Sequence, residues 1–326
     1  MKMQAVRVLP TADGGQLEIQ DIPIPEPGPG EVRVRVRASG INYGEIKHMR
    51  EHRAGQPVTA GVEFAGEIDC VGSQVQGWRV GDRVMGHGRG CHAQYVIAAP
   101  LALMALPDDV SYIDGAAFPN VFITAHDALV SNGELKAGES VFINGASGGV
   151  GMAAIMIASA LGAAPVIASS RSAQKLEQLA PFGMDVGIDA SSQDQVEAIM
   201  AATGGRGVDI IIDTIGGTVF EDHVKSLAVK GRLVNLARLG GAQYARLDIN
   251  QLWLNRLKLI GATFRTRSEQ ERLDCVQACA RDLLPFFRAG RLRLPVERTF
   301  ALPAIGEAYE YIVRSQHMGK LVLIPD

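Results

Sequence analysis

The sequence predicts an α/β protein with two domains, a compact β-barrel-like domain and a doubly wound parallel sheet. Three observations support this fold class. Residues 1–98 contain many short strand patterns separated by glycine and proline. From about Ser111 onward, strand and helix patterns alternate. The chain of 326 residues is also long enough for two domains.

The first domain is expected to consist mainly of short strands. Residues 4–9 and 17–22 predict two strands, whereas 22–30 (IPIPEPGPG) cannot pair regularly because proline lacks an N–H group. Residues 31–38 (EVRVRVRA) alternate valine and arginine, which indicates a strand with one buried and one solvated face. After a loop and a short helix, further strands are expected over 58–71, 80–86 and 93–98.

The second domain follows a helix predicted over 112–131. Its alternation gives strands at 141–144, 165–169, 186–188, 208–213, 231–236 and 257–262, and helices at 149–161, 172–180, 193–202, 218–225 and 268–289. The chain then returns to β character near its end. We therefore expect residues 1–118 and 289–326 to form one domain and 119–288 to form the parallel-sheet domain.

Composition argues against several classes of partner. The formal net charge of -3, with dispersed Lys and Arg, gives no electrostatic basis for binding nucleic acid or an anionic membrane. The four cysteines form no disulfide or zinc pattern, and reduced thiols fit a cytoplasmic protein. The N-terminus lacks the apolar core of a signal peptide. The uncharged stretch 141–170 is interrupted by glycines and Pro165, so it predicts a buried sheet rather than a membrane span.

A glycine-rich turn at 144–151 (NGASGGVG) joins a buried strand to an apolar helix, which is the context of a dinucleotide-binding fingerprint. Glycine lets the backbone approach a pyrophosphate, and Gly151 would let the helix pack closely on the strand. The helix N-terminus would offer N–H groups to the phosphates. A purely structural turn is the alternative. The expected cofactor contacts are Ala146, Ser147, Gly148, Gly149 and Val150.

The end of the next strand predicts NADPH rather than NADH. It carries Ser169, Ser170 and Arg171, followed by Lys175, and no Asp or Glu occurs between residues 162 and 177. An acidic residue there would bind a ribose 2′-hydroxyl, whereas hydroxyls and cations suit a 2′-phosphate. The alternative is an ordinary helix start with Ser172 as N-cap. Two later strand ends should also face the cofactor, through Ile215 and Leu239, with Asp213 as a structural turn residue.

Several stretches together resemble the medium-chain dehydrogenase/reductase superfamily over nearly the whole chain. They are residues 23–45, 60–84, 122–129, 144–151 and 319–326. Specifically, the sequence resembles the zinc-independent NADPH:quinone oxidoreductases, the group that includes zeta-crystallin. This resemblance implies a GroES-like catalytic domain, a Rossmann domain and an active site in the cleft between them. It also implies a homodimer, with residues 257–263 as the pairing edge strand.

The resemblance also assigns residues. In zinc-dependent relatives a Cys, a His and a second Cys hold the metal, but here Ser39 and Val62 occupy two of those positions and no four-cysteine lobe is present, so no metal is expected. Asn42 matches an Asn near the nicotinamide, while Glu45 replaces the family's Asp. Tyr43 is a candidate for polarising the acceptor, and His126 is a candidate proton donor. Both could instead be structural.

The remaining assignments concern the cofactor. By resemblance, Thr124 lies beside the nicotinamide amide, Lys175 binds the 2′-phosphate, and Lys320 matches the family's C-terminal lysine. Phe264 follows the sixth predicted strand and is expected to contact the cofactor and to line the acceptor pocket.

The leading hypothesis is hydride transfer from NADPH to a quinone, with the cofactor supplying the chemistry. One alternative is reduction of an α,β-unsaturated carbonyl (an enone or enoyl substrate). The loop at residues 47–56 argues modestly against it, because it has His48 and His52 but lacks the Tyr of many enoyl reductases. Another alternative is a non-catalytic NADPH-binding sensor or structural protein.

Overall fold

The computed structural model describes residues 1–314 and 317–325. The chain forms two compact units. Unit 1 consists of Met1–Asn120, Val276–Arg281 and Arg293–Asp326, and unit 2 consists of Val121–Cys275 and Asp282–Leu292. Ser315, Gln316 and Asp326, which the sequence places in the first domain, lie outside the described residues.

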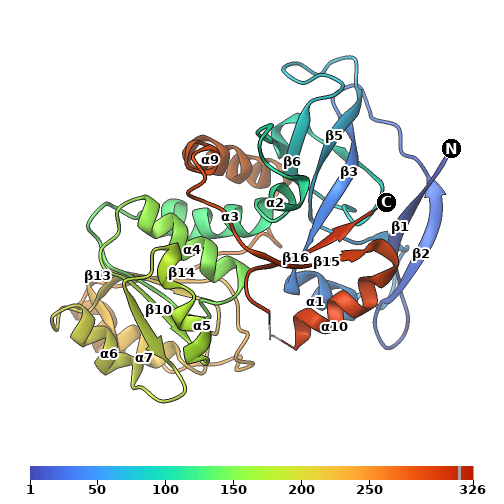
Figure 1. Ribbon diagram of the computed structural model, residues 1–326. Coiled ribbons are helices and arrows are strands. Elements are labelled where there is room, and N and C mark those ends of the chain that lie inside the picture. The colour runs from blue at the N-terminus through green and yellow to red at the C-terminus, as the bar shows by residue number, and fades with distance from the viewer. Residues whose placement is uncertain (315–316, 326) are drawn as a thin grey trace. The chain divides into compact units, whose positions relative to one another are not determined.

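Unit 1 is built mainly from short strands (Figure 1). They are β1 (Lys2–Leu9), β2 (Gln16–Pro23), β3 (Val32–Ile41), β4 (Val58–Thr59), β5 (Glu63–Val71), β6 (Arg83–His87), β7 (Tyr95–Ala98), β8 (Leu103–Ala105), β15 (Val296–Ala301) and β16 (Lys320–Ile324). One sheet has the order β2-β1-β4, and the other has β15-β16-β3-β5-β6-β8 with β7 also paired to β3. The helices are α1 (Tyr43–Glu51), α2 (Tyr112–Ala116) and α10 (Ile305–Val313).

Strand β3 confirms the expected alternation. Its valines, Val32, Val34 and Val36, are buried in the core of this unit. Its arginines lie on the opposite face, and two of them form ion pairs with the neighbouring strand. One of these pairs joins Arg33 to Asp69 of β5 at 3.0 Å. The outer face of β3 therefore carries ion pairs and is not simply exposed to solvent.

The prediction of a single strand over residues 58–71 is wrong. Gly61 has φ +96, and this left-handed conformation separates β4 from β5. A Cβ atom at Gly61 would lie 2.4 Å from the backbone nitrogen of His92, so only glycine allows the two segments to approach. The break lets the backbone of His92 lie against residues 60 and 61, just before β5, where its N–H donates to the carbonyl of Ala60 at 2.9 Å.

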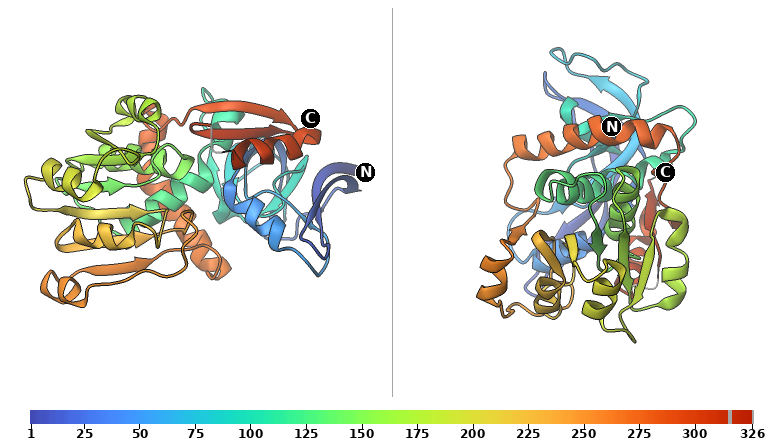
Figure 2. Two further views of the ribbon diagram at one scale, coloured as in Figure 1. Left: turned by 90° about the horizontal axis from the view of Figure 1, so that it is seen from below. Right: turned by 90° about the vertical axis from the view of Figure 1, so that its left-hand side faces the viewer.

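Unit 2 contains a six-stranded parallel sheet with helices packed against it (Figure 2). The strand order is β11-β10-β9-β12-β13-β14. Successive strands are therefore added toward one edge of the sheet after β9 and toward the other edge after β12. Right-handed crossovers toward the two edges place helices on both faces. On one face, α6, α7 and α8 bury a core that includes Phe142 and Ile211. The carboxyl ends of β9 and β12 flank the switch point, where ligands of such sheets bind.

Most boundaries in unit 2 agree with the predicted alternation, but β13 begins four residues before the predicted start at 231, and α8 has no predicted counterpart. The strands are β9 (Val141–Ile143), β10 (Val166–Ser170), β11 (Val186–Asp189), β12 (Val208–Asp213), β13 (Leu227–Asn235) and β14 (Lys258–Gly261). The helices that lie wholly in unit 2 are α4 (Gly149–Ala160), α5 (Ala173–Glu177), α6 (Gln195–Ala202), α7 (Phe220–Lys225) and α8 (Ile249–Leu254), and those that lie partly in it are α3 (Pro119–His126) and α9 (Glu269–Arg288). The predicted helix over 112–131 is interrupted, because Pro119 starts a new helix after α2.

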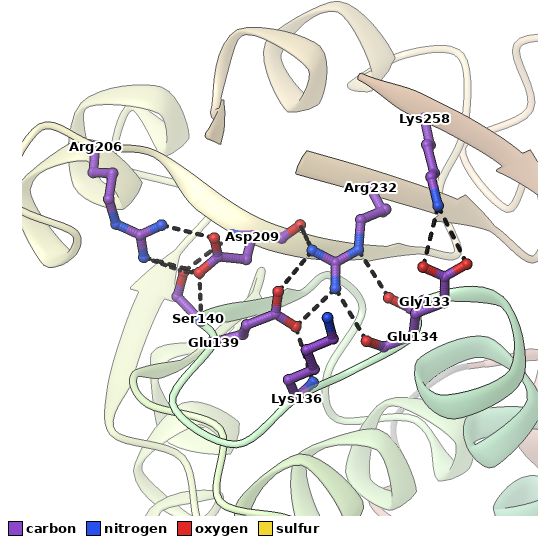
Figure 3. Close-up of polar contacts among 9 residues, drawn as sticks. All are labelled: Gly133, Glu134, Lys136, Glu139, Ser140, Arg206, Asp209, Arg232 and Lys258. Carbon is purple, nitrogen blue, oxygen red and sulfur yellow. Dashed lines mark hydrogen bonds and ion pairs between the residues drawn. The ribbon is translucent and has the colours of Figure 1, made fainter. Parts of the chain in front are cut away.

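A cluster of charged side chains lies at the amino ends of the strands of unit 2 (Figure 3). Arg232 of β13 is 8% exposed and binds the Glu139 carboxylate with two nitrogens, at 2.9 and 2.7 Å. It also donates to the backbone carbonyl of Gly133 at 2.8 Å. Beside it, Asp209 of β12 accepts from Arg206 at 2.7 Å. We call these charged residues the amino-edge cluster.

No helix among the residues that the structure describes is both long and apolar enough to cross a bilayer.

Candidate functional site

The glycine turn between β9 and α4 has the close-packed backbone that a dinucleotide site requires. A Cβ atom at Gly151 would lie 2.7 Å from the Cα of Ala146 and from the carbonyl oxygen of Gly145. Helix α4 begins after Gly148, and no side chain caps its first turn. Its amino-terminal N–H groups therefore suit an anion, and the predicted contacts Ala146 to Val150 lie together here.

Two side chains tie this turn to the neighbouring strand ends. Asn144 at the end of β9 donates to Asp213 at the end of β12 at 2.7 Å, and it accepts from the backbone nitrogen of Thr214 at 2.8 Å. Asp213 is fully buried and also accepts from the backbone nitrogens of Ile215 and Gly216, each at 3.0 Å. The predicted structural role of Asp213 is confirmed by these contacts.

The turn after β13 is joined to the turn after β12 by two backbone hydrogen bonds. Leu239 donates to the carbonyl of Thr214 at 3.1 Å, and Gly240 donates to that of Ile215 at 2.9 Å. The structure thus brings Ile215 and Leu239 together at the carboxyl edge of the sheet. Leu239 is 58% exposed, which leaves an apolar side chain available at this edge.

The end of β10 also belongs to this edge. The carbonyl of Ser169 accepts from the backbone nitrogen of Ala146 at 3.0 Å, which holds the strand end against the glycine turn. Arg171 is exposed. Ser172 caps α5 by accepting from the backbone nitrogen of Lys175 at 3.3 Å, so the ordinary helix start coexists with the basic pair. Ser170 is buried, with its hydroxyl accepting from Ser172 at 3.2 Å.

The other predicted residues of unit 2 lie on its helices and on the segment after β14. Thr124 is half-buried in α3. His126 is 1% exposed, and its Nε2 lies 2.9 Å from a carboxylate oxygen of Asp282 in α9. Phe264 is half-buried and stacks under the Arg267 guanidinium, 5.0 Å from the ring centroid. The contact with Asp282 gives His126 a structural partner.

In unit 1, Asn42 precedes α1, and its side chain uses every hydrogen-bonding group that it has. Its nitrogen donates to Glu45 at 2.9 Å and to Glu63 at 2.8 Å. Its oxygen accepts from Lys320 at 2.8 Å and from Asn120 at 2.8 Å. Because an ammonium only donates, Lys320 fixes which end of the amide faces it. Asn42 is therefore held in one orientation.

Lys320 is 3% exposed and is committed within the same unit. Its ammonium binds Glu63 at 2.5 Å and the carbonyl of Ile41 at 3.1 Å, in addition to Asn42. These contacts match its three N–H groups. The structure therefore joins two predicted site residues, Asn42 and Lys320, both directly and through Glu63.

Glu45 extends this arrangement inward. It is 6% exposed, and its carboxylate lies 2.7 Å from Nε2 of His92 and accepts from the Tyr309 hydroxyl at 3.1 Å. Burial disfavours the carboxylate, but the His92 charge and hydrogen bond, the Asn42 amide and the Lys320 ammonium outweigh it and lower the pKa of Glu45. The other nitrogen of His92 lies 2.7 Å from the Ser39 hydroxyl.

Sequence reasoning missed four members of this arrangement, Glu63, His92, Asn120 and Tyr309. Their positions are brought together by strand register and helix packing. The one available signal was a histidine immediately before an apolar strand. Tyr43, by contrast, starts α1 and is 43% exposed, so its phenol is accessible.

Comparison with known proteins gives matches to both units. Residues 28–108 match the family model described as alcohol dehydrogenase GroES-like domain, and residues 149–278 match the one described as zinc-binding dehydrogenase. The quinone oxidoreductase-like protein 2 of Bos taurus is 29% identical over 288 residues, which cover 87% of this chain and 82% of that protein.

Solved structures agree over the full length. A quinone oxidoreductase of Pseudomonas syringae pv. Tomato DC3000 has a TM-score of 0.87 at 25% identity, covering 99% of this chain and 100% of that one. The CurK enoyl reductase has a TM-score of 0.83 at 26% identity, covering 99% of each chain. The chain belongs to the medium-chain dehydrogenase/reductase superfamily. Within this superfamily it belongs to the quinone oxidoreductase group.

The family prediction and the fold class, a GroES-like domain with a Rossmann-like parallel sheet, are confirmed. Membership makes the chain an oxidoreductase with a nicotinamide cofactor and a small-molecule substrate. The glycine turn fits that cofactor, because its backbone has no room for a side chain at Gly151.

Zinc is implied by the description of one family model, but the side chains here do not fit it. The Ser39 hydroxyl is bonded to His92 and to the carbonyl of Glu63. Burial, together with the charges of Glu45 and Glu63, raises the pKa of the Cys91 thiol well above its usual range, so it stays protonated. In the described part of the chain, no three His, Cys, Asp or Glu side chains are arranged to hold a metal ion.

Proposed function

We propose that the protein is a zinc-independent oxidoreductase that transfers a hydride from NADPH to a quinone. The proposal is carried by the carboxyl edge of the parallel sheet, where the glycine turn meets a strand end without an acidic residue. The quinone oxidoreductases among its structural relatives support the choice of acceptor. We further propose that residues 119–288 bind the dinucleotide and that residues 1–118 and 289–326 contribute to binding the acceptor.

The cofactor contacts follow from the residues at that edge. The first turn of α4, from Ala146 to Val150, would bind the pyrophosphate. Hydroxyls and cations would hold the 2′-phosphate, and side chains from α3 and the later strand ends would hold the nicotinamide. The residues proposed for the 2′-phosphate are Ser169, Ser170, Arg171 and Lys175. The residues proposed for the nicotinamide are Thr124, Ile215, Leu239 and Phe264. Lys320 would act through Asn42, since its ammonium is bound to Glu63.

When bound, the nicotinamide supplies the hydride. Tyr43 would donate a hydrogen bond from its exposed phenol to the acceptor oxygen. Asn42 would orient the start of α1 rather than donate to substrate, because its amide is fully used. A reduced quinone can take its protons from water, so a protein donor is not required. His126 remains the predicted donor from α3, and its contact with Asp282 makes the structural role the competing one.

Reduction of an α,β-unsaturated carbonyl is the second candidate. It is favoured by the likeness to the CurK enoyl reductase. His48 in α1 and His52, which follows it, would then be the histidines nearest to Tyr43 in sequence.

The decisive experiment follows NADPH and NADH oxidation by absorbance with a benzoquinone, an ortho-quinone and an enone in parallel. Rapid NADPH loss with the quinones is the expected result. Turnover with the enone alone would replace the first proposal by the second. Tight NADPH binding without any turnover would contradict both and favour a sensor.

A homodimer and a cytoplasmic location complete the proposal. Strand β14 is an edge of the sheet, and the adjacent helix α8 exposes Ile249, Trp253 and Leu254 by 60% or more. An exposed apolar helix that precedes an edge strand suits pairing with a second copy. Sedimentation would test it, with a monomer as the contradicting outcome.

A further inference from the structure

Unit 1 contains a buried line of hydrogen bonds, and the geometry of these bonds fixes how many protons the line holds. It runs from Ser39 in β3 through His92 to Glu45 in α1, and we call it the Ser39–His92–Glu45 line. Ser39 and His92 are 0% exposed and Glu45 is 6% exposed. Each polar atom must therefore find its partner within the protein.

The Ser39 end fixes one imidazole nitrogen. The hydroxyl oxygen lies 2.8 Å from the carbonyl oxygen of Glu63 and 2.7 Å from Nδ1 of His92. A carbonyl can only accept, so the hydroxyl proton goes to Glu63. Nδ1 must then carry its own proton and donate it to the hydroxyl oxygen.

The contact between His92 and Glu45 accounts for the remaining proton of the line. Nε2 of His92 lies 2.7 Å from Oε2 of Glu45, and one proton must lie between them. It belongs either to a carboxylic acid beside a neutral imidazole or to an imidazolium beside a carboxylate. Asn42 and Tyr309 both donate to the same carboxylate, at 2.9 and 3.1 Å, which stabilises its charged form. The count therefore favours an imidazolium with both nitrogens protonated.

The surrounding groups are consistent with that charge state. Lys320 from β16 and Glu63 from β5 pair with each other, so their charges largely cancel. Tyr309 from α10 is neutral, since burial and the Glu45 charge raise its pKa well above the usual range. The buried Cys91 thiol, next to His92 in the chain, is also neutral. The imidazolium is thus matched by Glu45.

We propose that His92 is a positioning residue, which keeps Glu45 ionised so that Glu45 and Glu63 together hold the Asn42 amide at the start of α1. Tyr43 follows directly, so the line would set where the phenol meets the acceptor. This role rests on the proposed function. Without the imidazole, the buried carboxyl group would take up a proton, and its new hydroxyl would compete with Asn42 as a donor.

The test begins with the charge state, which needs no substrate. In the ¹⁵N-labelled full-length protein, long-range ¹H–¹⁵N spectra at about pH 7 should show protons on both His92 nitrogens, as the contacts with Ser39 and Glu45 require. In E45Q the neutral amide can itself donate to Nε2, so only Nδ1 of His92 should keep its proton. A neutral imidazole in the wild-type protein at pH 7 would overturn the inference.

The positioning role has a separate readout. H92Q and E45Q should each shift the Asn42 side-chain amide resonances and lower kcat about tenfold or more, with the NADPH Kd unchanged within about twofold. The matched control is E51Q at the last residue of α1, a Glu-to-Gln change at a side chain that is 53% exposed, which should leave both unchanged. Unmoved Asn42 resonances and an unchanged kcat would refute the role. If the wild-type protein turned over no acceptor, the proposed function would fail, and the resonances alone would decide the inference.

Discussion

The two edges of the parallel sheet in unit 2 are built from similar side chains, but they differ in how fully their polar groups are bound by partners within the protein. At the amino edge, Arg232 gives its hydrogen bonds to Glu139 and to backbone carbonyls, and Asp209 is bound by Arg206 and Ser140 (Figure 3). At the carboxyl edge the side chains hold three turns together. The first turn of α4 there has no side-chain cap, and Arg171 is exposed.

This difference separates stability from binding along the same strands. A charge that is already matched by buried partners contributes to the free energy of unfolding but has little left for a ligand. Backbone N–H groups and an exposed cation contribute little to folding and are available to phosphates. Substitutions at the two edges should therefore affect different measurements.

The largest effect is expected from R232M. Removing the guanidinium leaves the partly buried Glu139 without its partner, which should lower the free energy of unfolding of unit 2 by about 4 kcal/mol. The measurement is urea denaturation followed by circular dichroism. NADPH affinity should be unchanged in the folded fraction. K258M is the control, because Lys258 and Glu134 are 54% and 60% exposed and their pair should contribute less than about 1 kcal/mol. Equal losses in both variants would contradict the comparison.

A second substitution, D213A, tests the carboxyl edge itself. Four donors lose their acceptor, including the Asn144 amide at 2.7 Å and the backbone nitrogens of Ile215 and Gly216. We expect a loss of about 3 kcal/mol in unfolding free energy. Unlike R232M, it should also weaken NADPH binding measured by calorimetry, because the turns that contact the cofactor are released. A stability loss with unchanged affinity would show that these turns do not form the site.

A third prediction uses pH to isolate the amino edge. Burial disfavours the Asp209 carboxylate, but hydrogen bonds from Arg206 and Ser140 outweigh it and lower the pKa of Asp209 to about 2. Because this pKa is depressed in the folded state, its contribution is present above about pH 4 and is lost as the pH falls toward 2. D209N should cost about 2 kcal/mol at pH 7 and progressively less in that acid window. A pH-independent difference would contradict the assignment.

Much of the fold could be predicted because its signals are local. The buried strands of a parallel sheet form short apolar runs, so the predicted strands at 208–213 and 257–262 lie within two residues of β12 and β14. The break at Gly61 could not be predicted, because it depends on the approach of His92, thirty-one residues away in sequence. Local patterns carry no information about such contacts.

The candidate site shows the same limit. The glycine turn and Arg171 could be named from spacing alone, since strand, turn and helix are consecutive. The Ser39–His92–Glu45 line could not, because its members come from three separate segments that the antiparallel pairing of unit 1 brings together. Lys320 was matched by resemblance, but its pairing with Glu63 depends on the contact between β16 and β3.

The smallest effect, and the one that separates the edges most sharply, is expected from R171A. The side chain is exposed, so its loss should leave the unfolding free energy unchanged within about 0.5 kcal/mol. If its guanidinium binds the 2′-phosphate, the NADPH Kd should rise about tenfold, which corresponds to one charge-assisted contact. The NADH Kd should change less than about twofold, because NADH has no 2′-phosphate. Calorimetric titration with both cofactors measures this, and K258A provides a control that removes one positive charge from the opposite edge. Equal weakening of NADPH and NADH would refute the 2′-phosphate role, and equal effects of the two variants would reduce it to a long-range charge effect.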